Sequence, residues 1–368
     1  MSTQVFTDKI RQEIIAGSEE SDRSVRFPAV AFNALKKAGF LKIILPGETL
    51  DFAIGNNTSI LNLLRQIGAA DLSVARIFEG HLNALMLISR FAGEEQKLRF
   101  FELAGQENLF GIWNTEAQNG IKFSSKDTGG VDIYGEKTFC SGSADLDCPI
   151  ITGQLDGAGW QMAVVPGSRL QNRIDDSFWD PLGMRASVSH KIDFTGIEID
   201  KDSLIGAPGD YYQQPWFSGG AIRFCAAQLG GAQSVMEETI QYLKTLHRTD
   251  DYAQKTRIAE MAVLINSGMS LISKAGEIAD AVVSGRTGTE MLTAFANMMR
   301  ISTEEIANRV MQLSEKSVGA RGLMRPARLE RLHRDLRYYL RQPAPDATLI
   351  AVADHVLSHN NSTHDIWS

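Results

Sequence analysis

The sequence predicts a multidomain α+β protein in which an antiparallel β-barrel lies between two helical domains. Helical periodicity dominates the N-terminal third, short β-branched runs separated by glycine follow over 131–199, and long helical segments return after Trp216. We expect an N-terminal α-helical domain over 1–110, a middle β-barrel domain over 111–215 and a C-terminal four-helix bundle over 216–368.

Each part of this prediction depends on a local pattern. In the first domain, apolar residues recur at helical spacing, Pro28 stands where a helix can begin, and Gly39 stands where that helix would end. The predicted helices cover 7–17, 28–39, 57–69, 71–90 and 93–103. The predicted strands include 131–134, 149–152, 161–165 and 190–194, whose short length and even spacing favour a small barrel. The four predicted bundle helices cover 224–246, 256–284, 289–318 and 328–340.

Composition excludes several classes of function. With 43% hydrophobic and 22% charged residues, the 368-residue chain is predicted to be globular with an ample core. The net charge of -7 argues against nucleic acid and anionic membranes as partners, because both select a basic excess. No apolar run approaches the length of a membrane helix and the first residues do not resemble a signal peptide, so we expect a cytoplasmic protein. The three cysteines form no CxxC or Cys/His cluster, which predicts neither a disulfide framework nor a metal site.

The stretch 111–142 is where the helical pattern gives way to strands, and it carries the first candidate binding residues. Trp113, Thr115, Phe139 and Ser141 would suit a flat aromatic ligand with polar edges, since rings stack and hydroxyls reach heteroatoms. The alternative is that the aromatic residues simply fill the core.

Five short motifs then follow one another along the chain in an informative order. They are GEEQK (93–97), TEAQNG (115–120), GEKTFCSG (135–142), GMRAS (183–187) and GARGL (319–323), the last followed by Arg331 and Asp335. Together they resemble the signatures of the acyl-CoA dehydrogenase superfamily of flavoproteins, and the resemblance extends over nearly the whole chain. It implies the same three-domain fold, an FAD cofactor, and a homodimer or homotetramer, because that family builds its flavin site across a bundle interface.

The resemblance also implies roles for individual residues. Thr115, Phe139 and Ser141 match the groups that the family places against the flavin ring, with Phe139 as the stacking partner and Ser141 near the reactive ring nitrogen. Trp113 either contacts the flavin or fills the barrel.

Three further residues match groups that bind the rest of the cofactor. Gly319 and Gly322 match glycines that approach the adenosine end, where a missing side chain permits close contact. Arg248 stands near the sequence position at which the family has an arginine that binds the cofactor diphosphate. The Lys-x-Phe-Gly that follows this arginine in the family is replaced here by Thr249–Tyr252.

The catalytic base is where the sequence departs most from the family. A dehydrogenase of this family needs a glutamate to remove a proton beside the thioester carbonyl. Its two known positions correspond here to Pro343 and Ile222, and neither is a carboxylate. Asp346 is the nearest acid and becomes the candidate catalytic residue; alternatively, it is a solvated loop acid or a helix cap.

Two further residues, Glu79 and His81, are predicted to line the substrate pocket. They fall on the helix that floors the family's acyl pocket, and a histidine there is reminiscent of the family's flavin-dependent monooxygenases. A lone histidine on an apolar helix is more often a core or surface residue. Ile121 and Lys122 replace the usual Ser-Asp of the first signature, which puts the standard contacts to coenzyme A in doubt.

The sequence therefore leaves three hypotheses. In the first, the chain is a flavin-dependent dehydrogenase that acts on an acyl thioester with a displaced base. In the second, it is a monooxygenase that takes reduced flavin from a reductase and needs no glutamate. In the third, it is a family member without catalytic activity. Of these three, we prefer the dehydrogenase. The expected partners are a small-molecule substrate, such as a CoA or other thioester, and an electron acceptor or flavin reductase.

Overall fold

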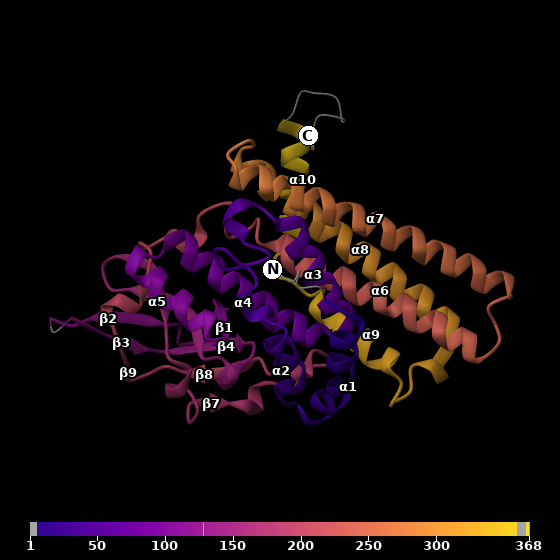
Figure 1. Cartoon of the computed structure of the whole chain (residues 1–368), viewed down its shortest axis with the longest axis horizontal. Helices are drawn as coiled ribbons and strands as arrows, with labels where there is room; N and C mark the ends of the chain where they lie inside the picture. Colours follow the sequence, from indigo (N-terminus) through magenta and orange to yellow (C-terminus); the bar gives the residue numbers. More distant parts are fainter. Residues whose placement is uncertain (1–5, 128, 359–365, 368) are drawn as a thin grey trace.

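The computed structural model describes residues 6–127, 129–358 and 366–367, and it has the predicted three-part architecture. Within these residues, five α-helices come first, two β-sheets follow, and five further α-helices come last. Figure 1 shows the strands on one side of the molecule, the long C-terminal helices on the other, and the N-terminal helices beside both. The fold prediction is confirmed.

The N-terminal helices begin at polar caps and bury their apolar faces. Thr7 accepts from the N–H of Ile10 at the start of the first helix, and Asp71 accepts from the N–H of Val74 at the start of the fourth. These helices are α1 (Asp8–Ser24), α2 (Ala29–Lys37), α3 (Asn57–Ala70), α4 (Leu72–Phe91) and α5 (Glu94–Gly105). Helix α4 buries 15 of its 20 residues, so it forms a central element rather than a surface helix.

The middle part forms two sheets. The strands are β1 (Phe110–Trp113), β2 (Lys122–Ser125), β3 (Gly130–Tyr134), β4 (Glu136–Cys140), β5 (Cys148–Leu155), β6 (Gly159–Val164), β7 (Ile174–Asp175), β8 (His190–Asp193), β9 (Ile197–Asp200) and β10 (Leu204–Ile205). The larger sheet has the order β10-β6-β5-β2-β3-β9, with β1 also on β5, and the smaller has the order β4-β8-β7.

Strand pairing is mixed, whereas the sequence predicted a wholly antiparallel barrel. Strands β1 and β2 both run parallel to β5. Strand β1 pairs with the first residues of β5, and β2 pairs with its last residues. The eight-residue β5 is long enough to accept two short strands along one edge. Pairing of this kind depends on how distant segments meet, which local alternation does not reveal.

The C-terminal helices are α6 (Ala221–Thr245), α7 (Tyr252–Val283), α8 (Thr289–Gly322), α9 (Arg328–Tyr339) and α10 (Pro345–Ser358). Helix α3 packs closely along α6, and glycine makes this possible. A Cβ on Gly68 would come within 2.2 Å of the carbonyl oxygen of Ala227, and one on Gly230 within 2.0 Å of the carbonyl oxygen of Arg65. The N-terminal domain and the bundle therefore share one continuous core. No helix among the described residues is long and apolar enough to cross a membrane.

Candidate functional site

The candidate site begins at Phe139, on the outermost strand of the smaller sheet. Strand β4 is an edge strand, and its pairing with β8 is irregular between Lys137 and Cys140. Phe139 lies in this irregularity with a φ of 55°, and 46% of the residue remains exposed. A left-handed backbone at a bulky residue costs roughly 1–2 kcal/mol, and such strain concentrates at functional sites. The irregularity turns an aromatic ring outward, where a flat ligand can stack on it.

Other aromatic rings support Phe139 from one side. Its ring meets Phe178 edge to face at 5.4 Å and Trp179 at 6.1 Å between centroids. Trp179 is itself held by Tyr338 of α9, at 5.8 Å. These contacts fix the orientation of Phe139 although much of its surface is exposed.

Ser141 ends a chain of three serine hydroxyl groups. Its Oγ lies 2.9 Å from Oγ of Ser189, which lies 2.8 Å from Oγ of Ser187. Ser187 is fully buried, and Ser189 is the only side-chain partner of its hydroxyl in the described chain. The Ser187 proton therefore points to Ser189, and Ser189 can donate either to Ser141 or to the Ser187 carbonyl, which is 3.5 Å away. When Ser189 donates to Ser141, the Ser141 proton is free to be donated to a ligand.

Thr115 is fixed next to β4 by backbone and side-chain bonds. Its carbonyl accepts the N–H of Thr138 at 3.1 Å, and the neighbouring Glu116 pairs with the fully buried Nζ of Lys137. Lys137 also donates to the carbonyl of Asn114 at 2.9 Å. The Thr115 residue itself is exposed. The structure thus brings Thr115, Phe139 and Ser141 together on two adjoining segments.

Trp113 lies beneath this surface. It is 2% exposed, its Nε1 donates to the carbonyl of Ser141 at 3.0 Å, and its ring packs near Phe194. This placement supports the core alternative for Trp113, in which it carries the segment that presents Ser141.

The residues proposed for the remainder of the cofactor lie in the bundle. Gly319 interrupts α8 with φ 63° and ψ -172°, and a Cβ there would meet no atom within 4 Å. Gly322, one turn further, is buried, and a Cβ there would lie 2.4 Å from Cβ of Val318. Arg248 is exposed after α6 and pairs with Asp251 at 3.2 Å. These three residues do not join the group at β4; their assignment to the cofactor stays a prediction.

Asp346, the candidate base, lies in the first turn of α10 and is exposed. In the described part of the chain, no hydrogen bond or ion pair connects it to Thr115, Phe139 or Ser141. An acid in the first turn of a helix complements the helix dipole, so the geometry favours the alternative reading of Asp346.

His81 is held in the core by two backbone groups. It is fully buried, Nε2 donates to the carbonyl of Leu41 at 2.6 Å, and Nδ1 accepts the N–H of Phe110 at 3.0 Å. Burial lowers the pKa of His81 to about 4, so the ring stays neutral. With both nitrogens used, His81 joins α4 to β1 instead of facing a pocket.

Glu79, the second predicted pocket residue, belongs to a buried polar group. Its side chain is 3% exposed, pairs with Arg76 at 2.6 Å and accepts from the amide of Asn83. Each carboxylate oxygen therefore has a partner, which leaves Glu79 poorly suited to act as a base.

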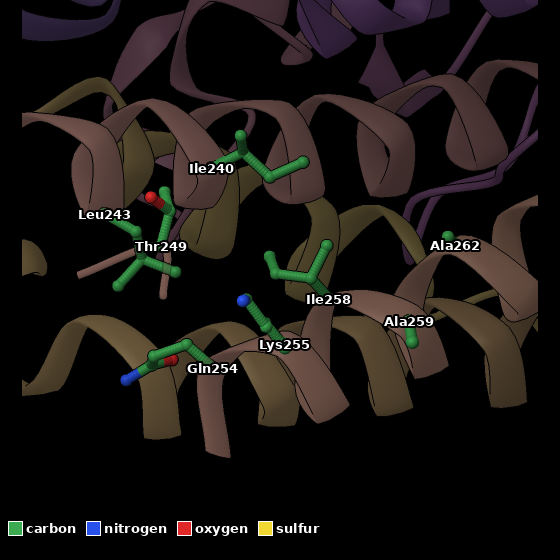
Figure 2. Close-up of a pocket in the computed structure, with 8 residues that line it drawn as sticks. All are labelled: Ile240, Leu243, Thr249, Gln254, Lys255, Ile258, Ala259 and Ala262. Carbon is green, nitrogen blue, oxygen red and sulfur yellow. The ribbon is translucent and has the colours of Figure 1, made fainter. Parts of the chain in front are cut away.

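A pocket in the bundle is lined by none of the candidate residues discussed above, although Arg248 directly precedes one of its lining residues, Thr249. Figure 2 shows it between α6 and α7, with a volume of about 290 Å³. Its lining is mostly apolar and consists of Ile240, Leu243, Thr249, Gln254, Lys255, Ile258, Ala259 and Ala262. None of the residues predicted from the sequence lines it.

Sequence reasoning missed the residues that position the site. Ser187 was quoted only as the last residue of a family motif, and Ser189 and Trp179 were not singled out. The sequence held no clear signal for these serines, because Ser187 ends a 3-10 turn and Val188 has a left-handed φ of 38°, so the alternation of an extended strand does not apply between Ser187 and Ser189.

Comparison with known protein families gives two matches at the ends of the chain. The model described as "Acyl-CoA dehydrogenase, N-terminal domain" matches residues 2–105, and "Acyl-CoA dehydrogenase, C-terminal domain" matches residues 209–340.

Individual relatives come from two branches. A dibenzothiophene monooxygenase of Rhodococcus erythropolis is 26% identical over 208 residues, which cover 53% of this chain and 49% of that enzyme, so the match spans about half of the relative. A cyclohex-1-ene-1-carbonyl-CoA dehydrogenase of Geobacter metallireducens is 23% identical over 92% of both chains. The structure of FMN-bound TdsC from Paenibacillus sp. A11-2 has the same fold, with a TM-score of 0.84 and 20% identity over 98% of each chain.

The two family models lie in the family's order and extend over most of the helical parts of the chain, so this protein belongs to the acyl-CoA dehydrogenase superfamily of flavin-dependent enzymes.

Proposed function

We propose that the protein is a flavin-dependent monooxygenase that acts on a small molecule with reduced flavin and O₂. One observation carries the proposal: the two positions of the family's glutamate base hold Ile222 and Pro343, while the nearby buried carboxylate, Glu79, is fully paired. A monooxygenase needs no such base. The match to dibenzothiophene monooxygenase supports the same choice.

The residues at β4 suit an isoalloxazine ring. Phe139 offers an exposed face for stacking, and Ser141 offers a hydroxyl group whose proton is available to a ligand when Ser189 donates to it. Thr115 supplies a second hydroxyl from the adjoining segment. A bound flavin supplies the electrons for activating O₂; the protein's part is to stack the ring, donate hydrogen bonds along its rim and keep its orientation fixed.

The proposed cofactor is FAD or FMN, because both contain the ring system that would stack on Phe139. FAD follows from the family resemblance of Arg248, Gly319 and Gly322, and the FMN in TdsC supports the smaller cofactor. Flavin extracted from the purified protein and separated by chromatography distinguishes them.

We also propose a homodimer or homotetramer that meets through the bundle. The apolar pocket between α6 and α7 and the exposed Val263 beside it support this arrangement. Sedimentation of the flavin-bound protein tests it, and a strictly monomeric species would contradict it.

A dehydrogenase that uses Asp346 is the second candidate, and the relative that matches 92% of both chains favours it. The two are separated by mixing the flavin-bound protein with acyl-CoA thioesters without oxygen, and by measuring O₂ consumption with reduced flavin and a flavin reductase. We expect rapid O₂ consumption and no bleaching of the flavin by thioesters. Bleaching that is lost in Asp346→Asn would establish the dehydrogenase instead.

A further inference from the structure

Two arginines converge on the polar group around Glu79. Arg76, Glu79 and Asn83 lie on one face of α4, and Nε of Arg223 on α6 donates to Oδ1 of Asn83. Since Glu79 holds the amide nitrogen of Asn83, the amide oxygen faces Arg223 and fixes its guanidinium. The result is a continuous chain of four polar side chains between the two helices.

This chain carries an unbalanced positive charge. It contains two guanidinium groups and one carboxylate, so one positive charge has no partner within it. Within the described residues, the two terminal nitrogens of Arg223 form no hydrogen bond. They are also not among the fully buried polar atoms without a partner, so both nitrogens face space that water can reach. An uncompensated charge in a protein interior is costly unless a ligand of opposite charge completes it.

An open space lies next to these groups. Gly80 is buried, yet a Cβ built on it would meet no atom within 4 Å. At 100° per residue, Gly80 points between the direction of Arg76 and that of Ile77. Ile77 in turn approaches Gly142, the neighbour of Ser141, because a Cβ on Gly142 would lie 3.4 Å from its side chain. The open position at Gly80 therefore lies between Arg76 and Ile77 on α4, and Ile77 itself reaches the end of β4.

The electrostatic surroundings agree with an enclosed site. The Arg76 side chain is 31% exposed. Burial is the largest influence on the pKa of Arg76 and lowers it, but the attraction of Glu79 and smaller contributions outweigh burial, so the pKa is raised overall. Burial also lowers the pKa of Arg223, which Glu79 partly offsets. Both facts fit guanidinium groups that line an internal space. The hydroxyl of Tyr339, within electrostatic range of Glu79 and Arg76, is buried and unpaired, and it adds a neutral donor.

We propose that Arg223 and Arg76, beside the open space at Gly80, bind an anionic group of the substrate, a carboxylate or another small oxyanion. The free end of Arg223 presents two parallel donors, which is the geometry that recognises such a group. The inference deepens the proposed function, on which it rests: it names the chemical class of a substrate whose other end would lie toward Ser141.

The test compares matched charged and neutral probes on the flavin-bound, full-length protein. Acetate is paired with acetamide and benzoate with benzamide, and dissociation constants are measured by calorimetry at low and moderate salt. We expect at least one anion to bind the wild type tenfold or more tightly than its amide, with the preference reduced by salt. Arg223→Gln and Arg76→Gln should each reduce the preference by at least fivefold, and Arg223→Lys should retain part of it.

Two controls separate this role from folding. Arg23→Gln removes one positive charge from an exposed position on α1 and should leave the preference unchanged. Gly80→Ala should be folded and no less stable, since its Cβ meets open space, whereas Gly80→Leu should weaken both the anion and the amide. Equal binding of each anion and its amide, or a preference that survives in both Arg223→Gln and Arg76→Gln, would overturn the proposal.

Flavin content is measured in the same samples. A wild type that binds flavin but does not distinguish acetate from acetamide, or benzoate from benzamide, contradicts the anion site alone. A wild type that prefers the anions but binds neither FMN nor FAD contradicts the proposed function and supports the anion site.

Discussion

The backbone N–H of Met184 donates to Oδ1 of Asp335 at 2.6 Å and joins the β part of the chain to α9. The approach is so close that a Cβ on Gly183 would lie 2.2 Å from the carbonyl oxygen of Arg334. The same turn continues to Ser187, the buried end of the serine chain. Asp335 therefore helps to position residues that adjoin the candidate flavin site.

Asp335 is expected to make stability fall as pH rises toward neutrality. Burial, together with repulsion from Asp71, raises its pKa to about 7, against an ordinary value of 3.8. Between these values the folded state holds a proton that the unfolded state has lost, so the free energy of unfolding decreases with rising pH, by roughly 1.4 kcal/mol per unit. Asp335→Asn keeps an acceptor for Met184 and removes this slope. Urea unfolding from pH 4 to 7 measures it, and identical slopes in the wild type and the variant would refute the assignment.

His81 is expected to act in the opposite direction. Its pKa is lowered to about 4 in the folded state, against 6.5 when unfolded, so the unfolded state binds the proton more readily. Stability is then lost as pH falls from about 6.5 to 4. His81→Gln retains a donor for Leu41 and an acceptor for Phe110 and should weaken this dependence, while His81→Ala leaves both groups unpaired and should cost about 2–4 kcal/mol. Thermal melting over pH 4–7 compares the stability of the three proteins. If the stability of His81→Gln falls with pH as steeply as that of the wild type, the loss of stability in acid does not come from His81.

Ser189 is expected to affect flavin binding without contacting the flavin. Removing its hydroxyl breaks the connection between Ser187 and Ser141, so the Ser141 proton is no longer directed toward a ligand. We expect Ser189→Ala to weaken flavin binding about 2- to 10-fold, corresponding to the loss of about 0.5–1.4 kcal/mol of hydrogen bonding. Titration of flavin fluorescence provides the measurement. Ser125→Ala, at an exposed position on β2, is the matched control and should bind as the wild type does.

The sequence predicted the helices well because their burial is local and periodic. The predicted helix 57–69 is α3 (Asn57–Ala70), and the predicted helix 71–90 is α4 (Leu72–Phe91). The parallel pairing of β1 and β2 with β5 was not predictable, since it joins segments that only the tertiary fold brings together.

The candidate site shows the same division between local and distant information. The grouping of Thr115, Phe139 and Ser141 was expected from the resemblance to the acyl-CoA dehydrogenase signatures, and the structure places them on adjoining segments. The setting of His81 was not, because its partners Leu41 and Phe110 are distant in the chain. Nor could the pattern of α4 alone reveal Arg223, which arrives from α6.

The exposed face of Phe139 is the surface on which the flavin ring is proposed to stack, and flavin affinity tests this stacking directly. The dissociation constants of FMN and FAD are measured for the wild type, for Phe139→Ala, and for Tyr134→Ala, a control on β3 with a similar exposure of 47%. Stacking of one aromatic ring contributes roughly 0.5–1.5 kcal/mol, so we expect Phe139→Ala to bind flavin about 2- to 10-fold more weakly and Tyr134→Ala to bind normally. Unchanged flavin affinity in Phe139→Ala would contradict a flavin site at β4.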